Sequence, residues 1–156
     1  MVNKFDFIAI HISPLWAEKA DFKIFADISA GSEKKEWEQL WTKSVGEQMY
    51  EICCVPFFVD NLAIGDTVQV DDQLVIRSVT KRSGHSTFRI WFGDLPSDFA
   101  SETGAKIFNL GFGVEWHSIK LLAVDCTGKK QFDILNSYLI ELSETFPINY
   151  EVASSP

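Results

Sequence analysis

The densest group of side chains that could do chemistry lies in one turn-like segment: Arg82-Ser83-Gly84-His85-Ser86-Thr87. Gly84 allows a turn conformation that a Cβ atom would resist. The guanidinium of Arg82, the imidazole of His85 and three hydroxyl groups offer the donors that a small anion needs. The same composition is also typical of an ordinary hairpin turn, in which Ser and Gly only shape the backbone. Three further basic residues lie nearby in the sequence: Arg77, Lys81 and Arg89.

Metal and nucleophile chemistry have weaker support in the sequence. No pair of histidines or cysteines has the C-x-x-C or H-x-x-x-H spacing that places two ligands on one zinc ion. A small hydrolase with a Ser or Cys nucleophile is the least favoured function, because the chain has no G-x-S-x-G elbow. We therefore expect no catalytic residue, no metal and no cofactor. The residues weighed are His11, His85, His117, Cys53, Cys54 and Cys126.

Acidic residues outnumber basic ones by 22 to 14, which gives a formal net charge of −8. This balance argues against nucleic acid as a partner, because binding phosphates requires a cationic surface. One interpretation of the acids is a set of solvated faces and helix ends. The other is an anionic surface that docks a basic protein. The candidate partner-binding residues are Asp60, Asp71, Asp72, Asp94, Asp98, Glu141 and Glu144.

Two classes of function are favoured over an enzyme. The first is a non-catalytic binding protein, in its most concrete form an immunity protein that neutralises a basic, nuclease-type toxin domain, since opposite charge speeds association. The alternative is a regulatory module that binds a small anion in the Arg82–Thr87 turn. The chain shows neither a signal peptide nor a run of the ~20 apolar residues that span a bilayer. We therefore expect a cytoplasmic protein without membrane contact; its oligomeric state is not indicated.

The pattern of apolar residues predicts that short strands flank the candidate turn and the loops that hold the acidic residues of the first half. Phe22–Ile28 alternates with a period of two and predicts a half-buried strand, whereas the apolar run Phe5–Ile12 predicts a buried one. The segment Pro56–Leu62 is too apolar for an ordinary loop, and we interpret it as one helical turn that plugs the sheet with Phe57 and Phe58. A small, bent antiparallel sheet or partial barrel is predicted from five further strands: Glu38–Ser44, Met49–Val55, Thr67–Val70, Gln73–Thr80 and Ser86–Phe92.

The periodicity changes to a helical one after Phe92. Pro96-Ser97-Asp98 predicts a helix start with Ser97 or Asp98 as the N-cap, and the helix should end by Gly111. Gln131–Ser143 predicts a second helix with one apolar stripe. Two more strands, Ser118–Val124 and Ile148–Val152, complete a β-α-β-α-β half.

The expected fold class is α+β, with two helices packed on the second sheet. No linker divides the sequence, so we expect a single domain over residues 1–156. The two halves should then share one hydrophobic core that includes Phe57, Phe58, Trp91, Leu122, Leu135 and Leu139.

The centre of the chain also carries pieces of a known pattern. The most specific pieces are Val55-Pro56-Phe57-Phe58 and Leu62-Ala63-Ile64-Gly65-Asp66, followed by Arg82–Thr87 and Phe88–Phe92. On these pieces the chain resembles the bacterial domain-of-unknown-function family 4265, most strongly over Leu40–Phe92. The resemblance implies a compact α+β domain. It supplies no catalytic residues, because none is established for that family.

Overall fold

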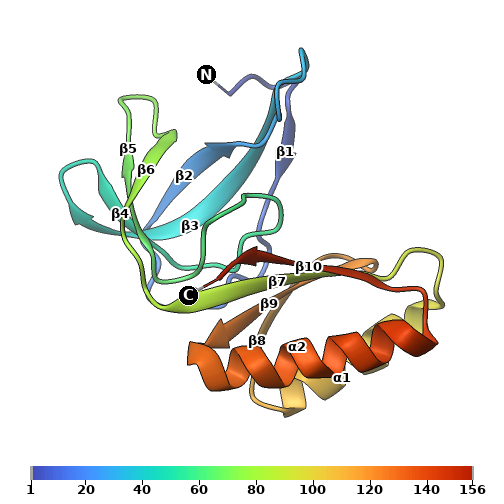
Figure 1. Ribbon diagram of the computed structural model, residues 1–156. Coiled ribbons are helices and arrows are strands. Elements are labelled where there is room, and N and C mark those ends of the chain that lie inside the picture. The colour runs from blue at the N-terminus through green and yellow to red at the C-terminus, as the bar shows by residue number, and fades with distance from the viewer. Residues whose placement is uncertain (1, 156) are drawn as a thin grey trace.

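The first half of the chain forms a strongly bent sheet (Figure 1). A computed structural model describes residues 2–155. The long strand β3 pairs with β1 in parallel and with β2 and β4 in antiparallel register, and β4, β5 and β6 follow as antiparallel neighbours. The strands of this sheet are β1 (Phe7–Ala9), β2 (Phe22–Asp27), β3 (Glu36–Gly46), β4 (Met49–Ile52), β5 (Thr67–Val70) and β6 (Ile76–Lys81).

The sheet curls until β2 meets β6, but it does not close into a barrel. A single parallel bridge joins Phe25 to Val75, and the Phe25 N–H donates to the carbonyl of Leu74 at 2.9 Å. The concave side is filled by aliphatic side chains that exclude water, among them Ile24, Leu40, Ile52 and Val68. The predicted bent sheet or partial barrel is confirmed, except that the predicted strand Ser86–Phe92 pairs in the second sheet instead.

The second half forms a four-stranded antiparallel sheet with the order β10-β7-β9-β8. With the chain order β-α-β-β-α-β, this is the arrangement called ferredoxin-like. Both helices cover the same face of the sheet (Figure 1). The elements are β7 (His85–Trp91), α1 (Ser97–Asn109), β8 (Gly113–Ser118), β9 (Leu121–Thr127), α2 (Gly128–Thr145) and β10 (Asn149–Ser154).

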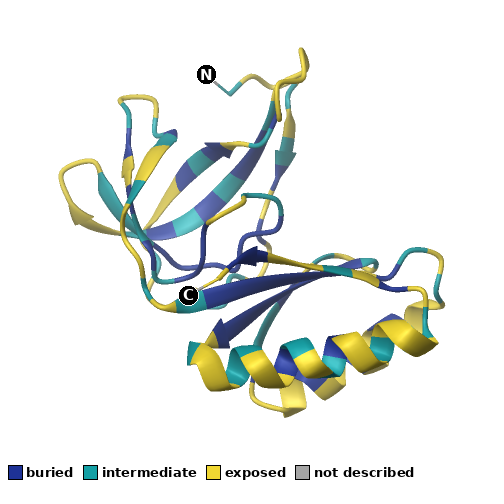
Figure 2. Cartoon of the chain, in the orientation of Figure 1, coloured by how far each residue is buried: buried dark blue, intermediate teal, exposed yellow. Residues whose placement is uncertain are grey.

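Burial explains why the helices choose that face. Alternate residues of β7 and β9, such as Ile90 and Leu122, point toward the helices and are fully buried against Leu135 and Leu139 of α2. Figure 2 shows the outer face of α2 as exposed, as expected of a helix with one apolar stripe. Within residues 2–155, no helix has the length and apolarity needed to cross a membrane.

Two predictions about the first half are wrong in detail, and one strand of the second sheet is missing from the prediction. Only Phe7–Ala9 of the predicted strand Phe5–Ile12 pairs with β3, and Phe5 and Ile12 are exposed. The segment Pro56–Leu62 contains no helical turn, because a buried carboxylate binds three of its backbone N–H groups. Strand β8 was not predicted; it is an edge strand whose burial pattern does not alternate cleanly.

The helix boundaries also differ. The N-cap of α1 is Pro96, with no side-chain cap, so Ser97 and Asp98 lie in the first turn instead. Helix α2 begins at Gly128, three residues before the predicted start at Gln131. The Gln131 side chain accepts a hydrogen bond from the N–H of Thr127, the N-cap residue, at 2.7 Å. It thereby satisfies a backbone donor at the start of the helix. Gly128 has a φ of 77°, a conformation that glycine adopts readily. This residue lets the chain turn from β9 directly into α2.

The predicted single core is wrong in its membership. Leu122, Leu135 and Leu139 belong to the core between sheet and helices, whereas Phe57 and Phe58 pack in a small separate cluster with Val55 and Ala123. Trp91 is 44% exposed. It follows Ile90 on β7, so the alternation of a strand directs its side chain to the face without helices.

Candidate functional site

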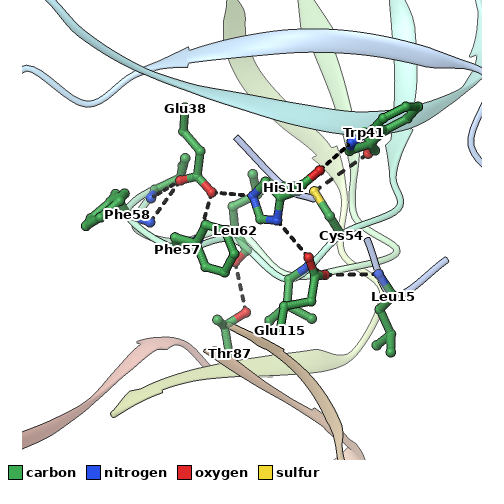
Figure 3. Close-up of polar contacts among 12 residues, drawn as sticks. His11, Leu15, Glu38, Trp41, Cys54, Phe57, Phe58, Leu62, Thr87 and Glu115 are labelled. Atoms are coloured by element: carbon green, nitrogen blue, oxygen red, sulfur yellow. Dashed lines mark hydrogen bonds and ion pairs between the residues drawn. The ribbon is translucent and has the colours of Figure 1, made fainter. Parts of the chain in front are cut away.

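A buried polar cluster lies where the helix-free face of the second sheet meets the first sheet (Figure 3). It consists of His11, from the segment after β1, Glu38 of β3 and Glu115 of β8. His11 Nε2 is 2.8 Å from Glu38 Oε2, and His11 Nδ1 is 2.8 Å from Glu115 Oε1. The side chains of all three are almost inaccessible to solvent, at 0–2% exposure. We call these residues the His11 cluster.

The two carboxylates of the His11 cluster also bind backbone N–H groups. Glu38 accepts from Phe57, Phe58 and Val59 at 2.7–3.0 Å. Glu115 accepts from Leu15 at 3.1 Å and from Val55 at 2.5 Å. The cluster therefore fixes the loop between β4 and β5 against both sheets. It also fixes the positions of the side chains of this loop, such as Phe57 and Phe58.

Protonation of His11 completes the cluster electrostatically. Burial alone would lower the pKa of His11, but Cys54 and then the carboxylates of Glu115 and Glu38 act against it and raise the pKa to about 12. Burial raises the pKa of the adjacent Cys54 thiol. The imidazolium thus pairs with two carboxylates in a dry junction. The ring of His11 also stacks on Phe57, with centroids 4.0 Å apart.

Sequence reasoning missed the His11 cluster, although one signal was available. The alternation of β3 places Glu38 on the same buried face as Leu40 and Thr42, an unusual position for an acid without a partner. The sequence predicts no zinc-ligand role for His11, because no second ligand has a suitable spacing. Among residues 2–155 no group of His, Cys, Asp and Glu is arranged to hold a metal ion. Because the cluster is closed to solvent, its chemistry is structural.

A pocket of about 500 Å³ opens beside the cluster on the part of the sheet that the loop leaves uncovered. Its walls are mainly aromatic, from Phe58, Trp91 and Tyr150, and it contains the polar side chains of Arg89, His117 and Glu151. We call it the aromatic pocket. Burial lowers the pKa of His117, so its ring is neutral at pH 7.

Arg89 is the central polar residue of the aromatic pocket and is largely buried. Its Nη1 donates to the Phe57 carbonyl at 2.8 Å and its Nη2 to the Val59 carbonyl at 3.2 Å. Nη2 also bonds Asp60 Oδ1 at 2.5 Å, and Nε lies 3.1 Å from Glu151 Oε1. One guanidinium is therefore shared by two carboxylates, which leaves this site with an excess of negative charge.

The predicted anion-binding turn is occupied by a carboxylate of the protein itself. Asp66, 1% exposed, accepts from the Ser83 N–H at 2.8 Å and from Arg82 Nη1 at 3.1 Å. Gly65 permits this contact, because a Cβ there would lie 2.9 Å from the Ser83 Cβ, at a φ of 84°. Anion binding at the turn stays a prediction, and any anion would compete with Asp66.

The remaining residues of the turn do not converge on one point. His85 Nδ1 lies 2.8 Å from Asp125 Oδ1, and burial raises the pKa of that carboxyl. Thr87 is buried and donates to the Leu62 carbonyl at 3.1 Å, whereas Ser86 alternates to the opposite face of β7. Gly84 is exposed, with a φ of 88° that suits the turn. The side chains of the turn thus bind different parts of the surrounding structure.

Phosphate provides a test of the turn. Because Asp66 competes for the donors, we expect phosphate to raise the melting temperature of the wild type and of Arg82→Ala by the same amount, through salt exclusion. Thermal unfolding at constant ionic strength measures both. An increment in the wild type that Arg82→Ala removes would instead show a specific anion site, since a bound ligand stabilises by mass action.

The structure places four of the seven acidic residues predicted to bind a partner at two neighbouring helix ends. Asp94 and Asp98 lie at the start of α1, and Glu141 and Glu144 lie near the end of α2. These helix ends are adjacent, since the rings of Phe99 and Phe146 lie 4.4 Å apart, and both are seen at the right of Figure 1. We call the four residues the acidic end.

The other three acidic residues lie elsewhere. Asp60 pairs with Arg89 beside the aromatic pocket. Asp71 and Asp72 are in the turn between β5 and β6, where Asp71 accepts from the Val75 and Gln73 N–H groups. The hydrogen bond from Val75 is the main cause that lowers the pKa of Asp71. Asp71 therefore has a structural role in its own turn.

Comparison with known proteins identifies a family but no activity. A family model described as "Domain of unknown function (DUF4265)" matches residues 38–150. The chain is also similar to a solved structure, that of a hypothetical protein from Neisseria gonorrhoeae, with 24% identity and a TM-score of 0.62 over 85% of this chain and 93% of that chain. At this identity the likeness shows the fold alone. No curated protein matches the chain.

Proposed function

Because the chain belongs to the family described as a domain of unknown function (DUF4265), which assigns it no activity, we propose from the geometry that it is a non-catalytic protein that binds a basic protein partner. In its most concrete form it is a cytoplasmic immunity protein that neutralises a basic, nuclease-type toxin domain. The observation that carries the proposal is the acidic end, where residues from both helices meet.

The charge at the acidic end is exposed and little compensated. The Asp94 side chain is fully exposed, and its ion pair with Lys120 is long, at 3.7 Å. Glu141 and Glu144 are exposed and form no ion pair within residues 2–155. Charges that are neither paired nor buried set up a field that attracts an oppositely charged partner and raises its association rate.

Helix stability does not explain the two glutamates. Glu144 lies in the last turn of α2 and Glu141 one turn earlier, close to the negative end of the helix dipole. Acidic side chains are unfavourable there, and cations would be favourable. Asp98, in contrast, lies in the first turn of α1, where an acid stabilises the helix. Glu141 and Glu144 thus weaken the helix slightly, which supports a role in binding.

Co-expression tests the immunity proposal. The wild-type protein should form a complex with a basic toxin encoded beside its own gene and should restore growth of cells that express this toxin. Lysozyme, a basic non-partner, serves as a control at the same ionic strength and should form no stable complex. A neighbouring toxin that is neither bound nor neutralised would contradict the immunity proposal.

A further inference from the structure

The aromatic pocket has the composition of a site for one large side chain. Its volume of about 500 Å³ lies within the range of small-molecule sites. Trp91, 44% exposed, forms one wall although a tryptophan on a free surface is costly to leave in water. Exposed aromatic residues beside a concave surface are the usual anchors of protein recognition.

The charges in and beside the pocket favour a cation. In the lining, the positive charge of Arg89 is matched by the carboxylate of Glu151, and Asp60, which pairs with Arg89 beside the pocket, adds a second negative charge. His117 adds none at pH 7, because burial lowers its pKa. A cationic occupant would balance the site, whereas an anion would add to an existing excess of negative charge.

Glu151 is free to turn toward an occupant. Its side chain is 64% exposed, and its Oε1 lies 3.1 Å from Arg89 Nε. Arg89 itself is only 7% exposed, yet its Nε N–H makes no hydrogen bond within the described residues. The contact with Glu151 is therefore an ion pair without hydrogen-bond geometry.

We propose that the aromatic pocket receives an arginine side chain of the basic partner, with the guanidinium on Trp91 and paired with Glu151. The inference rests on the proposed function, because the partner supplies the arginine. Arginine suits the site better than lysine for two reasons. Its guanidinium is planar and stacks on aromatic faces, and it is more weakly hydrated than an ammonium group. Its fork also matches the two oxygens of a carboxylate.

The test uses N-acetyl-L-arginine N-methylamide as a probe of the whole chain. Titration followed by ¹H–¹⁵N NMR should shift signals around the pocket, including the Trp91 indole. Trp91→Ala and Glu151→Gln should each weaken binding about five-fold, as the loss of one cation–π or ion-pair contact predicts. Glu47→Gln is the matched control, because Glu47 is an exposed carboxylate in the distant turn between β3 and β4.

Three results with the arginine probe, its lysine counterpart or the variants would overturn the inference, and a fourth comes from benzoate. The three are equal binding of the corresponding lysine amide, unchanged affinity in both pocket variants, and shifts spread over all surface carboxylates. Stronger binding of benzoate would assign the pocket to an anion and also overturn it.

The toxin assay separates this inference from the proposed function. A toxin complex unaffected by Trp91→Ala would overturn the pocket's role alone. Binding of the arginine amide with no toxin complex would overturn only the proposed function.

Discussion

Replacing His11 with alanine is expected to destabilise the fold by about 3–5 kcal/mol, the cost of removing one partner from a buried ion pair. The imidazole lies between Glu38 and Glu115, and both carboxylates would then remain in a site closed to solvent. The variant also loses the ring that stacks on Phe57. Equilibrium denaturation with urea, with coincident fluorescence and circular dichroism transitions, measures the free energy of unfolding.

His117→Ala is the control for the loss of an imidazole. His117 also contacts the rings of Phe57 and Phe58, but its Nδ1 has no hydrogen-bond partner within residues 2–155. Its removal should cost about 1 kcal/mol, the usual effect of a substitution that breaks no polar network. If His11→Ala lowered the free energy of unfolding by no more than this control, the His11 cluster would not be a major stabilising contact between the two sheets.

The contribution of His11 to stability should depend on pH in a known direction. Its pKa in the folded protein is raised from 6.5 to about 12. A raised pKa gives stabilisation that is fully present below about pH 6.5 and is lost as the pH rises toward 12. The difference in unfolding free energy between wild type and His11→Ala should therefore decrease from pH 7 to pH 10. A constant difference would mean that His11 is not charged in the fold.

Much of the fold was predictable because its signals are local. The apolar stripe of α2 and the turn glycines depend only on neighbours in the sequence, as does the alternation of β2 and β5. Strand β8 was missed because an edge strand that faces solvent, a pocket and the core in turn shows no simple period. Trp91 was predicted to lie in the core but is 44% exposed, because composition alone does not show which face of a strand the helices cover.

The His11 cluster could not be predicted because its residues are far apart in the sequence. His11 and Glu115 are separated by 104 positions and are brought together only when the second sheet packs on the first. The acidic end is a mixed case. Its four residues were identified as partner-binding candidates, but their proximity depends on the antiparallel arrangement of α1 and α2 along one sheet. Sequence reasoning thus identified residue types, and topology determined which of them meet.

Reversing two charges at the acidic end, by Glu141→Lys together with Glu144→Lys, is expected to slow association with the toxin about ten-fold at low salt. Both side chains are exposed, so the fold should stay intact. Lysine near the end of α2 should even stabilise the helix, by about 0.3–1 kcal/mol for each favourable charge. Stopped-flow fluorescence measures the association rate, and thermal unfolding measures the stability.

The matched control carries the same change in net charge at a distant site. Glu33→Lys with Glu47→Lys alters two exposed positions in the connections on either side of β3. Asp71 is unsuitable as a control because it accepts hydrogen bonds from two backbone N–H groups of its own turn. If the acidic end docks the toxin, the control should slow association far less, and the difference should vanish near 1 M salt, where the Debye length is about 3 Å. Equal slowing in both variants would mean that only total charge matters, and the acidic end would lose its role as the docking face.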